Sequence, residues 1–188
     1  MFFNKFELKK IGFSKVGKNV KVSKYAKFYS FDGIIGDNSR IDDYAILKGH
    51  VKIGKNVHVS SFDYIASVGG LITIGDYTGI SANVCIYSVS DDYIGNFMTN
   101  PTVSEKFRNI TKGKVKISEN VSIGAGSVIL PNVSIGHSAS IGALSIVNKT
   151  IKPGCLYINR GKEIYTKLKD IEKIKKKIKK FKKLNSPI

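Results

Sequence analysis

The chain has three histidines, and their spacing restricts the acid–base and metal chemistry that they could carry out. The histidines are His50, His58 and His137. A zinc site needs about three converging ligands, usually including histidine. These three residues fall at the fourth, sixth and third positions of the six-residue repeat described below, so we expect none to lie above another. We therefore predict no metal site, and His58 remains as a candidate general base.

A second set of polar residues opens a long interruption of the same repeat. Asp91 and Asp92 are followed by Tyr93 and, further along, by Asn100. A carboxylate favours the charged form of a neighbouring ammonium group, so these residues could capture an amine substrate. They could also do no more than solvate the start of a loop. Because such a carboxylate opposes deprotonation of the amine, the proton would leave through His58 or solvent.

The elements that must position these groups follow from an internal repeat, in which an aliphatic residue and a small or polar one recur every six positions. Examples are VGKNVK from Val16, IGDNSR from Ile35 and ISENVS from Ile117. Placing every repeat gives eighteen anchors, all Ile, Leu or Val except Phe28. They stand at positions 16, 22, 28, 35, 41, 47, 53, 59, 65, 74, 80, 86, 117, 123, 129, 135, 141 and 147.

The interruptions of the repeat define the shape of the chain. The register breaks only after positions 28, 65 and 86, by one, three and 25 residues. Each break follows a multiple of three hexads, as expected if three hexads make one coil of a triangular prism and every insertion leaves at one corner. We therefore predict an all-β fold, a parallel β-helix of hexapeptide repeats with about six coils. In this register Gly79 is stacked on His58, which would leave space beside the imidazole.

The ends of the prism need caps, because an open coil is an exposed sheet edge. Residues 1–11 contain Asn4 and Glu7 in a capping-box pattern and predict a short N-terminal cap. Residues 12–161 make up the β-helix, with an extended loop over residues 88–114.

Residues 162–188 are rich in lysine and predict a C-terminal amphipathic helix. Its apolar stripe consists of Ile164, Leu168, Ile171, Ile174, Ile178 and Phe181. Two interpretations stay open for this helix. It packs on its own assembly and presents a solvated basic face, or it rests on an anionic membrane surface.

Composition narrows the class of protein. A chain of 188 residues with 42% hydrophobic and 24% charged side chains has the make-up of one globular domain. The net charge is +17, yet only three of the 31 basic residues are arginine, the favoured reader of phosphates and bases, so we expect no nucleic-acid partner. No apolar run approaches the ~18 residues of a membrane span, so we expect neither a membrane span nor a signal peptide. Two cysteines are typical of a reduced, cytoplasmic protein.

The segment over residues 112–164 resembles the last coils of the left-handed β-helix sugar acetyltransferases that use acetyl-CoA. This resemblance implies a homotrimer and a site between neighbouring prisms. It also implies that the pantetheine arm lies along small corner residues, that lysines meet the CoA phosphates and that an Asn stands in the exit turn. The matching positions are Ala125, Gly126, Ala143, Lys149, Asn159 and Lys162.

The motifs FELKKIGF, RIDDYAIL, NVHVSSF and YSVSDDYIGN extend the resemblance over nearly the whole chain before the lysine tail. Together they are most similar to acetyltransferases that make 3-acetamido-3,6-dideoxyhexoses on a dTDP carrier. Related maltose and galactoside enzymes have their general-base histidine where Asp91 stands here, which leaves His58 as the base. The resemblance implies N-acetylation of a nucleotide-linked amino sugar for surface polysaccharides. An O-acetyltransferase of lipopolysaccharide or capsule sugars and a non-enzymatic scaffold are the alternatives.

Overall fold

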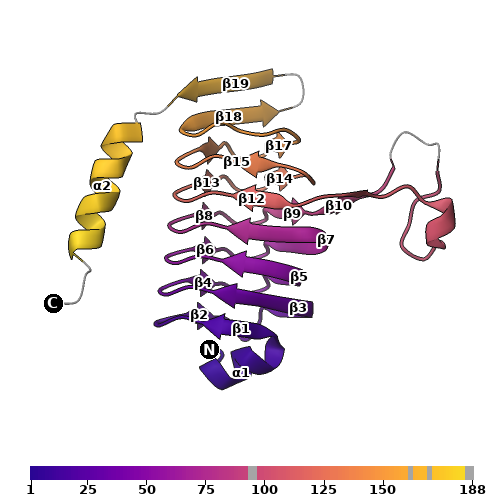
Figure 1. Ribbon diagram of the computed structural model, residues 1–188, viewed down its shortest axis with the longest axis horizontal. Helices are drawn as coiled ribbons and strands as arrows, with labels where there is room; N and C mark the ends of the chain where they lie inside the picture. The colour runs from indigo at the N-terminus through magenta and orange to yellow at the C-terminus, as the bar shows by residue number, and fades with distance from the viewer. Residues whose placement is uncertain (93–96, 161–162, 169–170, 185–188) are drawn as a thin grey trace.

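A computed structural model describes residues 1–92, 97–160, 163–168 and 171–184. Figure 1 shows short strands stacked in a column, with a helix at its N-terminal end, an arm projecting from its side and a second helix along its flank. The predicted parallel β-helix is confirmed. Among the described residues, no helix is long and apolar enough to cross a membrane.

Two large sheets make up the walls of the column, and a small third sheet forms the stalk of the arm. The first sheet contains β1 (Phe13–Val16), β3 (Lys27–Ile35), β5 (Ile46–Ile53), β7 (Tyr64–Ile74), β9 (Cys85–Tyr87), β12 (Val115–Ile117), β14 (Val128–Ile129), β15 (Ser134–Ile135) and β17 (Ile146–Val147). The second contains β2 (Lys21–Val22), β4 (Arg40–Ile41), β6 (His58–Val59), β8 (Gly79–Ile80), β13 (Ser122–Ile123), β16 (Ser140–Ile141), β18 (Cys155–Arg160) and β19 (Glu163–Leu168). The stalk consists of β10 (Val89–Ser90) and β11 (Thr111–Lys112), and the helices are α1 (Lys5–Ile11), the 3-10 turn η1 (Glu105–Phe107) and α2 (Ile171–Leu184).

The anchors stack residue on residue in the predicted register, coil after coil. In the second sheet the column runs through Val22, Ile41, Val59, Ile80, Ile123, Ile141 and Tyr157. This column has seven levels, one more than the six coils that the repeat predicts. The additional coil begins at Ile151, which pairs with Ile135. Ile151 follows the last anchor, Val147, by four residues instead of six, so the repeat does not reveal it.

All the insertions leave at one corner, as predicted. The pairing of β3 with β5 shifts between Tyr29 and Asp32, and the pairing of β5 with β7 shifts between Gly49 and Val51. The arm leaves at the same corner one coil later, between β9 and β12. Longer segments therefore gather on one edge, and the other two corners keep their tight turns.

Oxygen atoms inside the column link one coil to the next. At one inward position of several hexads, a side-chain oxygen accepts a hydrogen bond from a backbone N–H of the following coil. Asp63 Oδ1 accepts from Val84 N at 2.9 Å, and Ser127 Oγ accepts from Ser145 N at 3.3 Å. The same arrangement recurs at Ser39, Thr78 and Ser145. These bonds satisfy polar groups within an otherwise aliphatic core.

The N-terminal cap is confirmed as α1, and its capping box is formed. Glu7 N donates to Asn4 Oδ1 at 2.9 Å, and Asn4 N donates to a carboxylate oxygen of Glu7 at 2.7 Å. Leu8 is buried against the first coil. These contacts fix the helix across the open end of the prism.

At the C-terminal end, the predicted helix over residues 162–188 is wrong in its first part. Residues 163–168 form strand β19, antiparallel to β18, and α2 starts only at Ile171. Ile164, Tyr165 and Thr166 favour a strand, and the exposed edge of β18 supplies the partner. Phe181 of α2 lies 6.0 Å from Tyr77 of the prism, ring centre to ring centre.

Candidate active site

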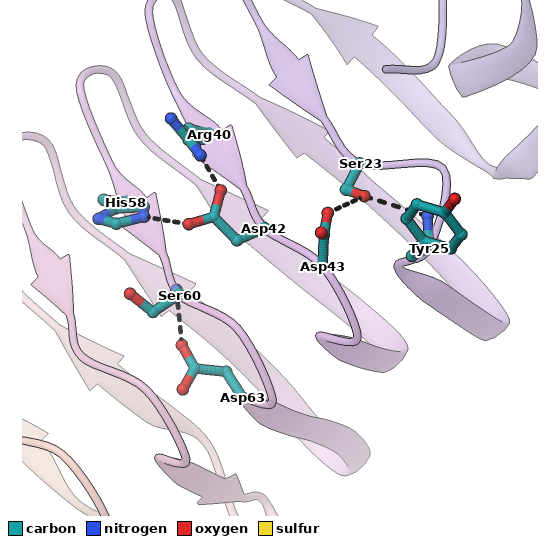
Figure 2. Close-up of polar contacts among 8 residues, drawn as sticks. All are labelled: Ser23, Tyr25, Arg40, Asp42, Asp43, His58, Ser60 and Asp63. Atoms are coloured by element: carbon teal, nitrogen blue, oxygen red, sulfur yellow. Dashed lines mark hydrogen bonds and ion pairs between the residues drawn. The ribbon is translucent and has the colours of Figure 1, made fainter. Parts of the chain in front are cut away.

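His58 stands on β6, and Figure 2 shows its imidazole beside the carboxylate of Asp42. Its Nε2 lies 2.8 Å from Asp42 Oδ2, and the other oxygen of Asp42 accepts a hydrogen bond from Arg40 Nε. The side chain of Asp42 is 16% exposed, whereas that of His58 is 48% exposed. A shielded carboxylate therefore holds an accessible imidazole from one side.

The charge of Asp42 determines which ring nitrogen of His58 can accept a proton. Burial opposes ionisation of Asp42, but hydrogen bonds from His58 and Arg40 outweigh it and hold the pKa of the carboxyl below its usual range. An ionised carboxylate can only accept hydrogen bonds, so Nε2 of His58 carries the proton that bonds it. Nδ1 is then the nitrogen with a free lone pair, and the ring can accept a proton there.

Open space lies next to this imidazole, as the repeat predicted. Gly79 pairs with His58 across the sheet, and a Cβ atom placed on Gly79 would meet no atom within 4 Å. Most other glycines of the chain approach a neighbouring coil so closely that a Cβ would clash. The glycine at position 79 is therefore not required by packing, and its effect is to leave room beside His58.

The root of the arm holds the other predicted group of polar residues. Asp91 Oδ1 lies 3.1 Å from a guanidinium nitrogen of Arg108, whose side chain is only 10% exposed. Asn100 donates its backbone N–H to Asp91 at 3.4 Å. Asp92 is partly buried beside them, and Tyr93 lies outside the described residues. The structure thus brings Asp91 and Asn100 together.

Arg108 is a residue that the sequence did not single out. It is one of only three arginines and the only one in the arm. This rarity was the sequence feature that could have marked it as a candidate site residue. Its Nε atom is buried and has no hydrogen-bond partner. The ion pair ties the two ends of the arm together and neutralises much of the charge of Asp91.

The small residues predicted to meet CoA lie one above another. Ala125 and Ala143 occupy the same corner in successive coils, and the backbone O of Ala125 accepts from Leu144 N at 2.9 Å. Gly126 takes a left-handed backbone conformation, φ 68°, in the same turn. Asn159 follows at this corner in the last coil.

Two of the polar residues predicted to meet CoA make contacts within the chain. Asn159 donates from its side-chain amide to Ile146 O at 3.0 Å. The ammonium group of Lys149 lies 5.6 Å from the centre of the Tyr157 ring. Lys162 lies outside the described residues.

The predicted residues thus fall into two groups at different corners of one prism. His58 and the small residues share the second sheet and the corner that follows it, whereas Asp91 and Asn100 lie on the arm. No contact between the two groups occurs among the described residues. Within the same part of the chain, no cluster of three His, Cys, Asp or Glu side chains could hold a metal ion.

Stacked hexapeptide coils with a small-residue corner and an accessible imidazole define the class, a parallel β-helix acyltransferase. The sequence matches the family described as bacterial transferase hexapeptide (six repeats) over residues 32–62 and 114–149. It is 42% identical over 151 residues to the dTDP-4-amino-4,6-dideoxy-D-glucose acyltransferase of Escherichia coli, covering 79% of each chain. The chain therefore belongs to the hexapeptide-repeat acyltransferases, as predicted.

Solved structures give the same assignment. AntD, an N-acyltransferase from Bacillus cereus, was crystallised with dTDP and 3-hydroxybutyryl-CoA. It is 36% identical, matches with a TM-score of 0.89, and the match covers 98% of each chain. A single-residue variant of AntD was crystallised with dTDP-4-amino-4,6-dideoxyglucose and coenzyme A. It is 36% identical and matches with a TM-score of 0.85, and the match covers 95% of this chain and 97% of the AntD chain. Both sugar names carry a 4-amino group, whereas the resemblance in the sequence implied a 3-amino group.

Proposed function

We propose that the protein transfers an acetyl group from acetyl-CoA to the amino group of a dTDP-linked amino-dideoxyhexose. The observation that carries this proposal is the similarity, over nearly the full chain, to an N-acyltransferase whose complexes hold dTDP and an acyl-CoA. The sugar named for the Escherichia coli relative and in the variant complex favours dTDP-4-amino-4,6-dideoxyglucose over a 3-amino isomer. The product would enter lipopolysaccharide or another surface polysaccharide, and the reaction would take place in the cytoplasm.

The chemistry assigns one proton to His58. A neutral amine attacks the thioester carbonyl, a C–N bond forms and the C–S bond breaks. The nitrogen must lose a proton in this step, and Nδ1 of His58 accepts it while Asp42 holds the opposite side of the ring. The proton then passes to the departing thiolate, which leaves as the CoA thiol. The space at Gly79 admits the reacting groups beside the ring.

A homotrimer would unite the two groups of candidate residues. The arm projects away from its own prism in Figure 1 and exposes Phe97, Met98 and Phe107, each about half accessible. Exposed apolar side chains on a protruding arm favour contact with another subunit. In such an assembly Asp91, Asp92, Tyr93 and Asn100 of one subunit would hold the acceptor sugar near His58 of its neighbour.

Acetyl-CoA would lie along the small-residue corner of the upper coils. Ala125, Gly126 and Ala143 admit the pantetheine arm close to the backbone, and Lys149 and Lys162 would meet the phosphates. Asn159 would contact the pantetheine group of CoA near the exit turn. For α2, the contact between Phe181 and Tyr77 favours packing on the prism over a place on a membrane surface.

Release of free thiol from acetyl-CoA tests the proposal directly. The protein is incubated with acetyl-CoA and, in parallel, with dTDP-4-amino-4,6-dideoxyglucose, a dTDP-3-amino isomer and dTDP-glucose, which offers only hydroxyl groups. We expect rapid release with the 4-amino sugar and product mass increased by one acetyl group. Release with dTDP-glucose but with neither amino sugar would instead identify an O-acetyltransferase.

A further inference from the structure

Three aromatic residues form a stacked, half-exposed column on one corner of the first three coils. We call Tyr25, Tyr44 and Phe62 the aromatic ladder. The ring centres of Tyr25 and Tyr44 are 5.7 Å apart, and those of Tyr44 and Phe62 are 5.2 Å apart with nearly parallel planes, 16° from each other. Each side chain keeps between 51% and 56% of its surface accessible. The ladder is therefore a column of stacked rings open to solvent.

The backbone under this ladder is unfavourable for aromatic residues. Tyr44 and Phe62 have φ angles of 63° and 65°, in the left-handed region that bulky residues rarely adopt. At the corresponding place in most other turns the chain has small residues suited to this conformation, namely Asn19, Asn38, Asn56, Asn83, Asn120, Asn132, Gly126 and Ser138, whereas Leu144 is a large side chain in the same conformation. Folding alone would favour asparagine at positions 44 and 62. An aromatic ring held in a strained turn instead indicates a binding role.

Another turn of this chain uses an aromatic residue in the same way. Tyr77 has a φ angle of 61°, and its ring contacts Phe181 of α2 edge to face. A ring in a left-handed turn thus serves as a contact for a second ring. Phe62 has Tyr44 on one face, and no ring within the described ranges lies against the other.

The ladder ends where a planar ligand could continue it. The next two coils have Asn83 and Gly126 in place of a ring, so the corner above Phe62 is not filled by a large side chain. The small residues proposed for CoA follow upward on this same corner. On the adjoining sheet, Lys21, Arg40 and His58 are stacked on β2, β4 and β6 and are exposed, and Asp42 pairs with both Arg40 and His58. Stacked rings suit a planar base, and an exposed row of basic side chains on the same coils suits the phosphates joined to it.

We infer that the aromatic ladder binds the base of the nucleotide carrier, with the base stacked on Phe62 as the next ring of the column. This inference rests on the proposed function and extends it by placing the nucleotide end of the acceptor on the first three coils. The acceptor and acetyl-CoA would then approach His58 along one corner from opposite ends.

Binding of dTDP alone to the full-length protein tests the inference by isothermal titration calorimetry. The variants are Phe62→Asn and the double variant Tyr44→Asn/Phe62→Asn, because asparagine fits the left-handed turns and keeps the fold. The matched control is Tyr77→Asn, an aromatic residue in the same conformation at a different corner. We expect the double variant to raise the Kd for dTDP by about tenfold or more, with the Kd for CoA within about twofold of the parent. The control should bind dTDP like the parent, and the melting temperatures of the Phe62 variant and the double variant should not fall.

Several outcomes would overturn the inference. An unchanged Kd for dTDP in the double variant would refute it, as would a change of oligomeric state in sedimentation, which would make the ladder a contact between copies. Thiol release separates this failure from that of the proposed function. A parent enzyme that acetylates the dTDP-amino sugar, with an unchanged KM in the double variant, would refute the ladder alone. A parent that neither binds dTDP nor releases thiol would refute both.

Discussion

Asp63 is a buried carboxyl whose ionisation should make the stability of the protein depend on pH. It lies inside the third coil, 1% exposed, where other coils have Ala, Ser or Val at the equivalent position. Burial raises its pKa to about 8, although backbone N–H groups of Val84 and Ser60 favour the anion. In the unfolded chain an aspartate titrates near ~4. The folded protein therefore binds this proton far more tightly than the unfolded chain does.

The sign and size of the effect follow from this pKa difference. Because the folded pKa is raised, the stability contributed by the protonated carboxyl is complete below about pH 4 and is lost as pH rises toward 8. Each pH unit within this window changes the free energy of unfolding by ~1.4 kcal/mol. The free energy of unfolding should therefore fall by on the order of 5 kcal/mol between pH 4 and pH 8. Asp42 has the opposite sign, since its pKa is lowered. The test must therefore compare matched variants.

The substitution Asp63→Ser isolates this contribution. Serine can keep the bond to the next coil, as Ser127 does with Ser145 N, but it does not titrate. We would measure urea unfolding of parent and variant between pH 4.5 and 8.5. The variant should be the less stable protein at pH 4.5, and the gap should close or reverse by pH 8.5. A difference between the two proteins that stays constant with pH would show that Asp63 is ionised in the folded state and that the reasoning is wrong.

Three further predictions concern the active site. Replacing His58 by Gln should lower kcat by roughly 10²–10⁴ with partial recovery at higher pH, and an unchanged kcat would make the residue structural. Gly79→Val should leave the melting temperature unchanged, because its Cβ meets no atom within 4 Å, but should lower kcat/KM by closing the space beside His58; full activity would show that this space is not used. Asp91→Asn and Asp92→Asn should raise the KM for the amino sugar and leave the KM for acetyl-CoA almost unchanged, and steady-state kinetics in which neither variant alters the sugar KM would remove the carboxylates from acceptor binding.

The sequence predicted the N-terminal cap and the interior of the fold, but not the C-terminal end of the prism. Spacing of six between Ile41, Leu47 and Ile53 is enough to place each anchor, because the inward positions of such a coil accept little except aliphatic side chains. After Val147 the next stacked residue, Ile151, comes too early for the repeat. Ile164 and Leu168 fit a helical stripe as well as a strand, and only the open edge of β18 decides between them.

The contacts of the site were less accessible to sequence reasoning than the fold. His58 and its open neighbour Gly79 followed from the repeat register. Asp42 did not, since it reaches His58 diagonally from the preceding coil, where side-chain direction and not register determines the contact. The ion pair between Asp91 and Arg108 depends on how a 25-residue insertion folds back, and that segment has no repeat to constrain it.

Both ends of the second sheet are closed by chain running in the opposite direction. At the top, β19 is antiparallel to β18, and at the bottom Phe2 forms an antiparallel bridge with Ser23. Phe3 N donates to Val22 O at 2.9 Å beneath the first coil. A parallel coil from another molecule would meet strands of the wrong direction at either end, with a different hydrogen-bond pattern. The solenoid therefore resists end-to-end polymerisation into fibres by strand polarity, and loss of residues 163–168 would leave the edge of β18 open to growth.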